Sequence, residues 1–242
     1  IKYSMNYMLN GGSFTDAKQA GTWTINDCGS ALPTLKRDGY LFEGWKDSSG
    51  NYVEKFPDSG NLKNLSLSAS WVQGTEGLVI SNGTVNSYNG TSTSVVIPKT
   101  FRGKSVTGIK EYAFKGCSNL TSITIPDSVT SIASGTFRDC SSLESMTLPF
   151  TGAAIRYTDA EGPDVVLGYI FGYKTTGGNE EIAGAICQYR NTINYYYYIP
   201  ESLKTVKING GAIGYHAFYN CNSLTNIMIG NNVTSIGDKA FY

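Results

Sequence analysis

Hydrophobic and polar positions recur with a fixed spacing between about residue 92 and the end of the chain. The segment CSNLTSITIPDSVTSIASGTFRD, residues 117–139, gives the pattern, and Cys140 begins a second copy that reaches Pro149. A third regular copy begins at Cys221, and less regular copies lie beside these. A spacing in the twenties is typical of stacked coils, in which no single coil can bury its own apolar face.

Each copy contains an apolar–polar–apolar triplet, such as Ile123–Ile125, which predicts a short strand. The proline that follows ends the strand, because proline has no N–H to donate to a sheet. Apolar residues at V-x-x-I spacing then point inward on the return side, and Ala-Phe packs the far corner. We therefore expect the inward positions to form one continuous buried stack. These positions are Leu120, Ile123, Ile125, Leu143, Met146, Leu148, Leu224, Ile227 and Ile229.

The outward positions of the same triplets form a neutral strip that is rich in hydroxyl groups. Its residues are Ser122, Thr124, Ser145, Thr147, Lys207, Asn226 and Met228. Two interpretations stay open. The strip is either ordinary solvated sheet surface or a ligand-binding face, since solenoids use such surfaces for binding.

The spacing breaks over residues 150–199, and this insertion holds eight of the chain's 17 tyrosines. Val165–Tyr173 and Asn191–Pro200 are rich in β-branched and aromatic residues, so we expect a β-hairpin or small sheet. Because side chains alternate along a strand, about half of the four-tyrosine run should face outward. Exposed tyrosine is common at protein interfaces and as a stacking platform for sugars. The alternative is that these rings pack on the solenoid or on the rest of the insertion. We expect any partner to contact this insertion, with the outward strip as a secondary surface. The candidate contact residues are Tyr169, Tyr173, Tyr195, Tyr196, Tyr197 and Tyr198, beside the Gly-rich loop Thr175–Glu181.

The repeat C-x-x-L-x-x-I-x-[IL]-P, with Ala-Phe before the next cysteine, resembles the BspA-type leucine-rich repeat. The resemblance covers about residues 92–149 and 201–242. It implies a right-handed solenoid with a parallel sheet on its concave face. It also implies a place on the cell surface, mainly of bacteria, with adhesion or protein binding as the expected role.

Residues 1–73 carry no trace of the repeat unit. They contain YMLNGG at Tyr7–Gly12, LPTLKRDGYLFEGW at Leu32–Trp45 and LSLSASW at Leu65–Trp71. Asn-Gly-Gly predicts a turn between strands, and the last segment alternates cleanly. In this order the motifs resemble the Listeria–Bacteroides repeat, the internalin-type B repeat. That resemblance implies a small β-grasp-like module that serves as a spacer or interaction unit, joined to the solenoid through the polar linker Val72–Gly77.

Composition excludes some classes of function. With 19 basic and 19 acidic residues among 242, the net charge is zero, so binding of nucleic acid or of an anionic membrane has no electrostatic basis. No apolar run is long enough for a membrane span. Low charge with many small polar residues suits an extracellular β-rich protein. We expect an excised piece of a secreted or surface protein whose signal and anchor segments lie elsewhere.

Three of the five cysteines, Cys117, Cys140 and Cys221, hold the same place in the repeat. We expect a buried ladder of free thiols, because cysteine packs like a small hydrophobe. An odd number without a C-x-x-C pair argues against a metal site and a disulfide scaffold. No cofactor is expected.

Catalysis has little support in the sequence. The single histidine, His216, takes the place of Tyr112, Gly135 and Lys239 in other copies, so we expect an unconstrained surface position. The insertion's acidic residues lack calcium-loop spacing and give no sign of a glycosidase pair, so we interpret them as solvated loop charge. They are Asp159, Glu161, Asp164, Glu180 and Glu181.

The sequence therefore predicts a mainly β protein with two domains: a β-grasp-like module, 1–73, and a leucine-rich-repeat solenoid of about five coils, 74–242, interrupted at 150–199. The expected function is non-enzymatic binding of another protein on a host or microbial surface. Two alternatives remain: a carbohydrate-binding or wall-associated module that uses the insertion's tyrosines, and a purely structural spacer.

Overall fold

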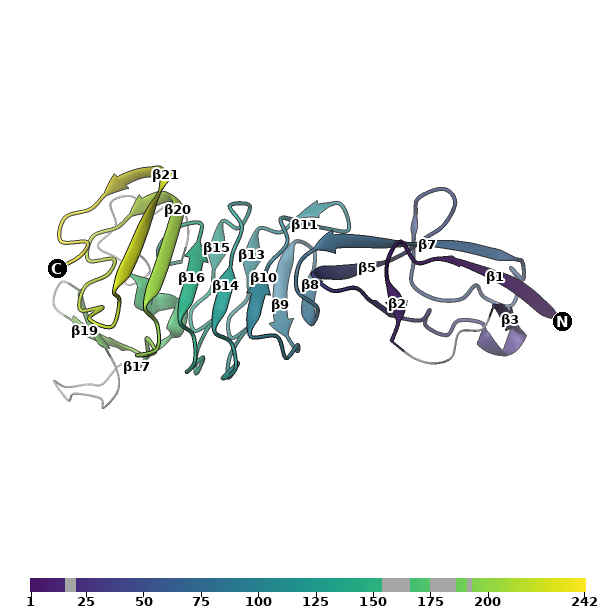
Figure 1. The fold of residues 1–242 in the computed structure, drawn as a ribbon, viewed down its shortest axis with the longest axis horizontal. Helices are drawn as coiled ribbons and strands as arrows, with labels where there is room; N and C mark the ends of the chain where they lie inside the picture. The colour runs from purple at the N-terminus through teal and green to yellow at the C-terminus, as the bar shows by residue number, and fades with distance from the viewer. Residues whose placement is uncertain (16–20, 154–165, 175–185, 191–192) are drawn as a thin grey trace. The chain divides into compact units, whose positions relative to one another are not determined.

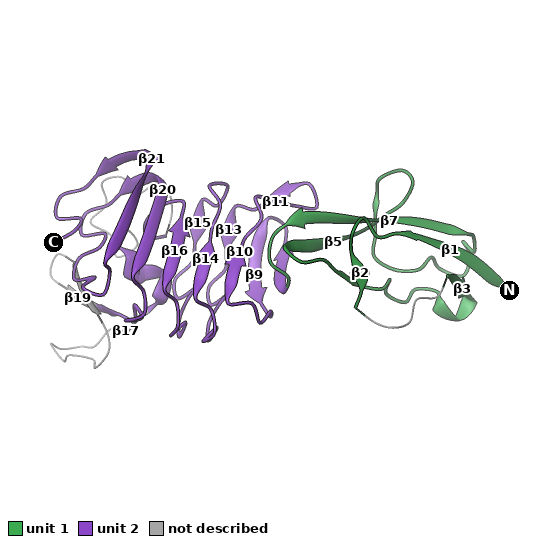
Figure 2. Ribbon diagram, in the orientation of Figure 1, with its two compact units in different colours: residues 1–76 green, residues 77–242 purple. Residues whose placement is uncertain are grey.

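The computed structural model describes residues 1–15, 21–153, 166–174, 186–190 and 193–242. The chain divides into two compact units, Ile1–Glu76 and Gly77–Tyr242, whereas the sequence placed the boundary after residue 73 (Figure 2). The described chain is mainly β, and the 3₁₀ helices η1 (Ile25–Asp27) and η3 (Leu167–Phe171) are short.

Unit 1 is built on a mixed five-stranded sheet in the order β3-β1-β7-β5-β6, with β2 and β4 as a separate antiparallel pair. The first strand lies parallel to the last one, β7, and β5 lies antiparallel to β7. The strands are β1 (Lys2–Met8), β2 (Ser13–Phe14), β3 (Thr22–Thr24), β4 (Leu35–Lys36), β5 (Tyr40–Lys46), β6 (Tyr52–Val53) and β7 (Leu65–Gln73).

The Asn-Gly-Gly turn lies where the sequence predicted it, between β1 and β2. Asn10 and Gly11 both have positive φ, 48° and 85°, a conformation that asparagine and glycine tolerate better than other residues. A Cβ atom on the next residue, Gly12, would collide with the ring of Trp71. The turn therefore needs glycine for its backbone and for the close approach of an aromatic ring.

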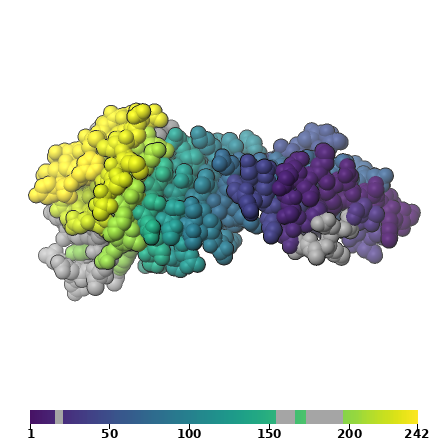
Figure 3. All heavy atoms as spheres, in the orientation of Figure 1, coloured from purple at the N-terminus to yellow at the C-terminus, as the bar shows by residue number. Residues whose placement is uncertain are grey.

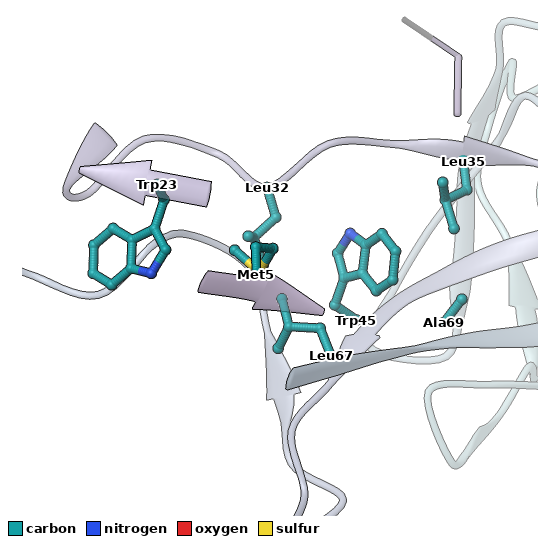
Figure 4. Close-up of a cluster of buried hydrophobic side chains, with 7 residues drawn as sticks. All are labelled: Met5, Trp23, Leu32, Leu35, Trp45, Leu67 and Ala69. Atoms are coloured by element: carbon teal, nitrogen blue, oxygen red, sulfur yellow. The ribbon is translucent and has the colours of Figure 1, made fainter. Parts of the chain in front are cut away.

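The core of unit 1 is a cluster of dissimilar side chains (Figure 4). Trp23 and Trp45 are its largest members, 1% and 2% exposed. Each indole N–H donates a hydrogen bond to a backbone carbonyl, from Trp23 to Lys63 at 3.0 Å and from Trp45 to Pro33 at 2.7 Å. Both polar atoms are therefore satisfied within the apolar cluster.

Unit 2 contains two sheets with parallel pairing, one on each side of the coils (Figure 1). The strand order is β10-β14-β16-β20-β21 in the first sheet and β15-β13-β9-β8 in the second, where β8 and β9 pair antiparallel. The first sheet consists of β10 (Ser94–Val96), β14 (Ser122–Thr124), β16 (Ser145–Leu148), β20 (Thr205–Ile213) and β21 (Asn226–Ile236). The second consists of β8 (Leu78–Ser81), β9 (Thr84–Tyr88), β13 (Gly108–Ile109) and β15 (Ser131–Ile132).

The sheet register reproduces the period of the sequence. Ser122 pairs with Ser145 and Ile109 with Ile132, and each pair is separated by one repeat along the chain. Ser94 pairs with Ser122 over a longer separation, because a hairpin of β11 (Thr100–Phe101) and β12 (Lys104–Ser105) lengthens the first coil. The coils follow one another as bands of colour on the face drawn in Figure 3.

The predicted core stack is confirmed for six of its nine residues. The leucine, isoleucine and methionine positions of the copies at 117–149 are at most 2% exposed. In the last coil, Leu224 and Ile227 are only half-buried, and Ile229 is 45% exposed, so its predicted burial is wrong. Strand β21 lies at the sheet edge, so among the described residues these side chains have a neighbouring coil on one side only.

A ladder of aromatic rings lines the Ala-Phe corners. Phe114 stacks on Tyr88 at 5.5 Å between ring centroids and on Phe137 at 5.3 Å, and Phe137 contacts Phe171 at 6.2 Å. In the last two coils Phe218 stacks on Phe241 at 5.4 Å. Each phenylalanine of the repeat therefore packs on its counterpart rather than on an unrelated side chain.

A short segment of the insertion stacks on the preceding coil in the place of a repeat corner. Residues Leu167–Phe171 form the 3₁₀ helix η3, so the predicted strand at Val165–Tyr173 is wrong over these residues. The amide N–H of Phe137 donates to the carbonyl of Ile170, as that of Phe114 donates to Thr136 one coil earlier. Phe171 thus fills the phenylalanine corner, and Leu167, Ile170 and Phe171 are fully buried.

The rest of the insertion contains the small sheet that the sequence predicted. Strand β19 (Ile193–Tyr197) is central in the order β17-β19-β18 and pairs antiparallel with both neighbours. Its partners are β17 (Tyr173–Lys174) and β18 (Ile186–Arg190). The chain then turns through Pro200 and enters β20 at Thr205, so this sheet precedes the amino end of β20.

Candidate functional site

The register places the predicted outward residues in two rows across neighbouring strands. Ser122, Ser145 and Asn226 share one row, and Thr124, Thr147, Lys207 and Met228 share the other. Their side chains are exposed or half-buried, whereas the residues between them are buried in β14, β16 and β20. We call these seven residues the polar strip.

Sequence reasoning missed three members of these rows. Ser94 and Thr205 extend the first row and Val96 extends the second. The Ser122 hydroxyl donates to that of Ser94 at 2.8 Å, which ties adjacent coils together at the surface. The signal for Ser94 and Val96 was the alternation around Val95 and Ile97 in a less regular copy, which the hairpin in the first coil places outside the regular spacing.

The strip can offer hydroxyl donors and acceptors at regular intervals and has one positive charge, Lys207. Adjacent strands lie about 4.8 Å apart, so the rows repeat at that interval. The buried stack beneath them holds their backbone in place. The arrangement suits contact with an extended polar surface of a partner, because short side chains lose little entropy on binding.

The tyrosine run is buried in part. Tyr196 is 6% and Tyr197 is 1% exposed, although neighbours in a strand point to opposite faces. Both faces of central strand β19 are therefore covered at this end, and these two residues are not available for contact as the sequence suggested. Tyr198 and Tyr169 are half-buried and retain exposed surface.

Other predicted contact residues lie partly or wholly outside the described residues. The backbones of Tyr173 and Tyr195 belong to β17 and β19, but their side chains are not described. The loop Thr175–Glu181 lies outside the described residues. So do the acidic residues Asp159, Glu161, Asp164, Glu180 and Glu181.

The cysteines of the repeat are free thiols of unequal burial. Cys140 and Cys221 are buried, whereas Cys117 is half-buried, so its predicted full burial is wrong. Cys117 and Tyr88 both line a pocket of about 280 Å³. The preceding coil has no cysteine to cover Cys117 on this side. The Cys140 thiol donates to the carbonyl of Phe114 at 3.1 Å, and burial raises its pKa to about 12, as it does for Cys221.

His216 is buried, 6% exposed, so the predicted surface position is wrong. The centroid of its ring lies 3.9 Å from the ring centroid of Tyr215 and 4.7 Å from the ring centroid of Tyr219. The position also has a backbone requirement, because His216 and its counterparts all have positive φ. They are Tyr112 (61°), Gly135 (63°), His216 (55°) and Lys239 (51°). Glycine is the residue that usually indicates a positive φ, and only one of these four residues is glycine. The requirement could therefore not be predicted from the sequence.

In the described part of the chain, no group of three or more histidine, cysteine, aspartate or glutamate residues could hold a metal ion. Within the same ranges, no helix has the length and apolar character needed to cross a membrane.

Comparison with known families identifies the repeat. A family model described as BspA type leucine rich repeat region matches in six copies, over residues 84–158 and 191–242. These two ranges make up more than half of the chain. Among curated proteins, no match was found.

Three solved structures are similar to the chain at low identity. A T. pallidum leucine-rich-repeat protein is 19% identical, with a TM-score of 0.29 over 69% of this chain and 50% of its own. A leucine-rich cell-surface protein from Faecalibacterium prausnitzii A2-165 is 21% identical, with a TM-score of 0.31 over 68% and 43%. A leucine-rich-repeat protein from Bacteroides ovatus ATCC 8483 is 22% identical, with a TM-score of 0.26 over 70% and 37%. The chain thus spans half or less of the length of each.

Proposed function

Since the chain belongs to the BspA type leucine-rich-repeat family, we propose that it is a non-enzymatic part of a bacterial cell-surface or secreted protein. In this proposal it binds another protein on a host or microbial surface. The polar strip is the main contact surface, and the exposed parts of Tyr198 and Tyr169 form a second one.

One observation carries this proposal: the polar strip is a solvent-facing surface on paired strands whose inward side chains are buried in β14, β16 and β20. Its members come from β14, β16, β20 and β21, which follow one another in a single sheet. Large parts of a partner could contact it without any rearrangement of the backbone, and pre-organisation of this kind lowers the cost of binding. The proposal includes a right-handed winding of the coils, which the family resemblance implies.

We also propose that unit 1 is a Listeria–Bacteroides repeat that acts as a spacer. Its four motifs occur in order along the sequence. The parallel pairing of the first strand, β1, with the last strand, β7, in the middle of the sheet supports a β-grasp-like arrangement. Under this proposal, deleting residues 1–76 leaves the affinity of unit 2 for its partner unchanged.

The experiment compares two arginine substitutions in a pull-down from host mucosal and bacterial surface extracts. Thr124→Arg puts a bulky charge in the polar strip, and Ser131→Arg is the matched control on the exposed side of β15 in the second sheet. We expect Thr124→Arg to abolish capture of the specific partner and Ser131→Arg to retain it. Equal capture by both variants would remove the polar strip from the proposal.

A second pair of variants tests the tyrosines without removing η3, which stacks on the preceding coil. Tyr198→Ala should weaken capture, whereas Tyr112→Ala, an exposed tyrosine at an Ala-Phe corner, should not. If Tyr198→Ala leaves capture unchanged, the polar strip alone carries the binding.

A further inference from the structure

The corner that follows the first-sheet segment of β20 is two residues shorter than its counterparts. From Ile125 to Ile132 the chain has six intervening residues, and from Ile229 to Ile236 it again has six. Between Ile208 and Ile213 it has four, Asn-Gly-Gly-Ala. We call residues 209–212 the short corner. Figure 1 shows β20 and β21 side by side, and their pairing continues through the short corner to Ile213.

Strand β21 accommodates its two additional residues as two irregularities in its pairing with β20. The register shifts once between Ile208 and Gly210 and once between Gly211 and Ala212. At the second shift Thr234 is left over, because Val233 and Ser235 take the two partners. At the first shift the additional residue falls at Gly230 or Asn231. Bulges re-aim side chains and are common beside binding sites.

The short corner also lacks the side chain that other coils place there. Gly211 pairs with Val233, and the corresponding valines of earlier coils, Val106 and Val129, are fully buried. Gly211 has a φ of 69°, a conformation that favours glycine. The corner is two residues shorter and lacks the valine side chain. These two differences together leave a hollow beside residues 209–212.

Two adjoining pockets of about 340 and 440 Å³ occupy this hollow, and Asp127 and Asn232 line both. The first has an apolar floor of Pro149, Ala212 and the two glycines, with Thr234 on its rim. The second adds the polar residues Lys207, Asn209 and Asn231. The additional residues at both shifts line the pockets, because Thr234 lines the first pocket and both Gly230 and Asn231 line the second.

Hydrogen-bonding groups surround the hollow, and their charges balance. Asp127 lies in an earlier coil and its carboxylate accepts a hydrogen bond from the Asn209 side-chain amide at 3.1 Å, across 82 residues of sequence. Lys207 supplies one positive charge against the negative charge of Asp127. The pocket therefore favours neither an anion nor a cation.

We propose that the short corner binds one neutral pyranose unit of a glycan. Amide and hydroxyl groups on the walls match vicinal sugar hydroxyls, and the floor of Pro149, Ala212 and glycine methylenes matches the C–H face of a sugar ring. Each pocket is near the small end of the range for ligand sites, which suits a single ring rather than a peptide segment. This site goes beyond the protein binding proposed above. It adjoins the carboxyl end of the polar strip in β20, with which it shares Lys207, whereas the tyrosine-rich sheet precedes the amino end of β20.

The test is saturation-transfer-difference NMR on the whole chain with D-galactose, D-glucose and N-acetyl-D-glucosamine as probes. N-acetylneuraminic acid serves as a charged comparison. We expect binding of at least one neutral sugar at roughly millimolar strength, as is reasonable for a small open pocket. Thr234→Trp fills the first pocket and should weaken that binding at least tenfold.

Thr107→Trp is the matched control, because Thr107 is also exposed and follows the corner valine of an earlier coil. It should bind the sugar as the unchanged protein does. Asn232→Ala and Asp127→Ala remove polar wall groups without adding bulk, and each should also weaken binding. Glu144→Ala, an exposed acidic residue outside the pocket, should not. Circular dichroism of every variant checks that it is folded.

Three outcomes would overturn the proposal. They are no transfer to any neutral sugar, equal binding by Thr234→Trp and Thr107→Trp, and stronger binding of the charged sugar than of the neutral ones. Thr124→Arg separates this site from the protein-binding surface. It should abolish capture of the protein partner and leave sugar binding unchanged, so failure of either proposal can be recognised alone.

Discussion

The two units bury their apolar residues in different ways. In unit 1, residues of different size and shape meet once, as Trp45 meets Tyr7, Phe14 and Phe42. In unit 2, the phenylalanines of the repeat meet their own counterparts, as Phe114 meets Phe137 and Phe218 meets Phe241. A unique cluster depends on every member, whereas a ladder gains stability from each neighbouring coil. The effect of a substitution in unit 2 should therefore depend on its place in the stack.

The largest effect should come from the middle of the aromatic ladder. Phe137→Ala removes a ring that is fully buried and contacts rings on both sides. We expect the free energy of unfolding of unit 2 to fall by about 3–5 kcal/mol. All three tryptophans, Trp23, Trp45 and Trp71, lie in unit 1, so their fluorescence reports on that unit alone. In urea, the circular dichroism transition should move and the fluorescence transition should not. A shift of both would show that the units unfold together.

The next prediction compares an inner coil with the last one. Leu120 is 1% exposed, and Leu120→Ala should cost about 2–5 kcal/mol. Leu224 holds the same repeat position but is half-buried, so Leu224→Ala should cost less, about 1–2 kcal/mol. Urea denaturation of both variants measures the difference. Equal costs would mean that burial of the last coil is the same as that of the inner coils.

The regular inner coils could be predicted from the sequence, whereas the burial of the last coil and the repeat corner at Phe171 could not. The regular copies predicted strand positions, register and the inner core, because a fixed period requires each coil to present the same inward set. The exposure of Ile229 depends on the number of neighbouring coils, which a single repeat does not encode. The repeat corner at Phe171 was missed because this phenylalanine follows Phe137 at a longer interval than the one that separates Phe114 from Phe137.

The candidate surfaces were predictable to different degrees. Strand alternation sufficed to find the polar strip, since outward positions follow directly from inward ones. Alternation failed for Tyr196 and Tyr197, because a central strand covered on both sides buries consecutive residues. The short corner was visible as two absent residues between Ile208 and Ile213, but the hollow beside it depends on how β21 bulges.

High pH should destabilise unit 2 before unit 1. Burial raises the pKa of the Cys140 and Cys221 thiols from 9.0 to about 12. Between these values the unfolded chain has lost thiol protons that the folded chain retains, so stability falls as the pH rises from 9 towards 12. In unit 1, burial and Asp27 raise the pKa of Tyr7 from 10.0 to about 12. The stability that this tyrosine contributes to unit 1 is therefore lost only as the pH rises above 10.0.

Thermal unfolding at pH 8 to 11, followed by circular dichroism and tryptophan fluorescence, measures this order. The variant Cys140→Ala, Cys221→Ala should show a flatter decline for unit 2 with the same decline for unit 1. A decline of unit 2 that is unchanged in this variant would assign the effect to other groups.

The smallest effect should lie outside both cores, in the β11–β12 hairpin. Arg102 and Gly103 have φ values of 51° and 74°, as a two-residue type I′ turn requires. Asparagine tolerates this conformation better than arginine, so Arg102→Asn should stabilise unit 2 by about 0.5 kcal/mol. Urea denaturation would detect this gain, and a loss of stability would indicate that the arginine side chain contributes more than its backbone strain costs.

The most direct test of the central claim, that the polar strip binds a protein partner, is site-specific photo-crosslinking. A benzophenone side chain is placed in turn at Thr124 in the strip, at Ser131 in the second sheet and at Lys36 in unit 1, all of which are exposed. Each protein is irradiated in host mucosal and bacterial surface extracts. Our account predicts a discrete crosslinked species from position 124 that the other two positions do not give. Crosslinking of the same species from 131 or 36, with none from 124, would contradict it.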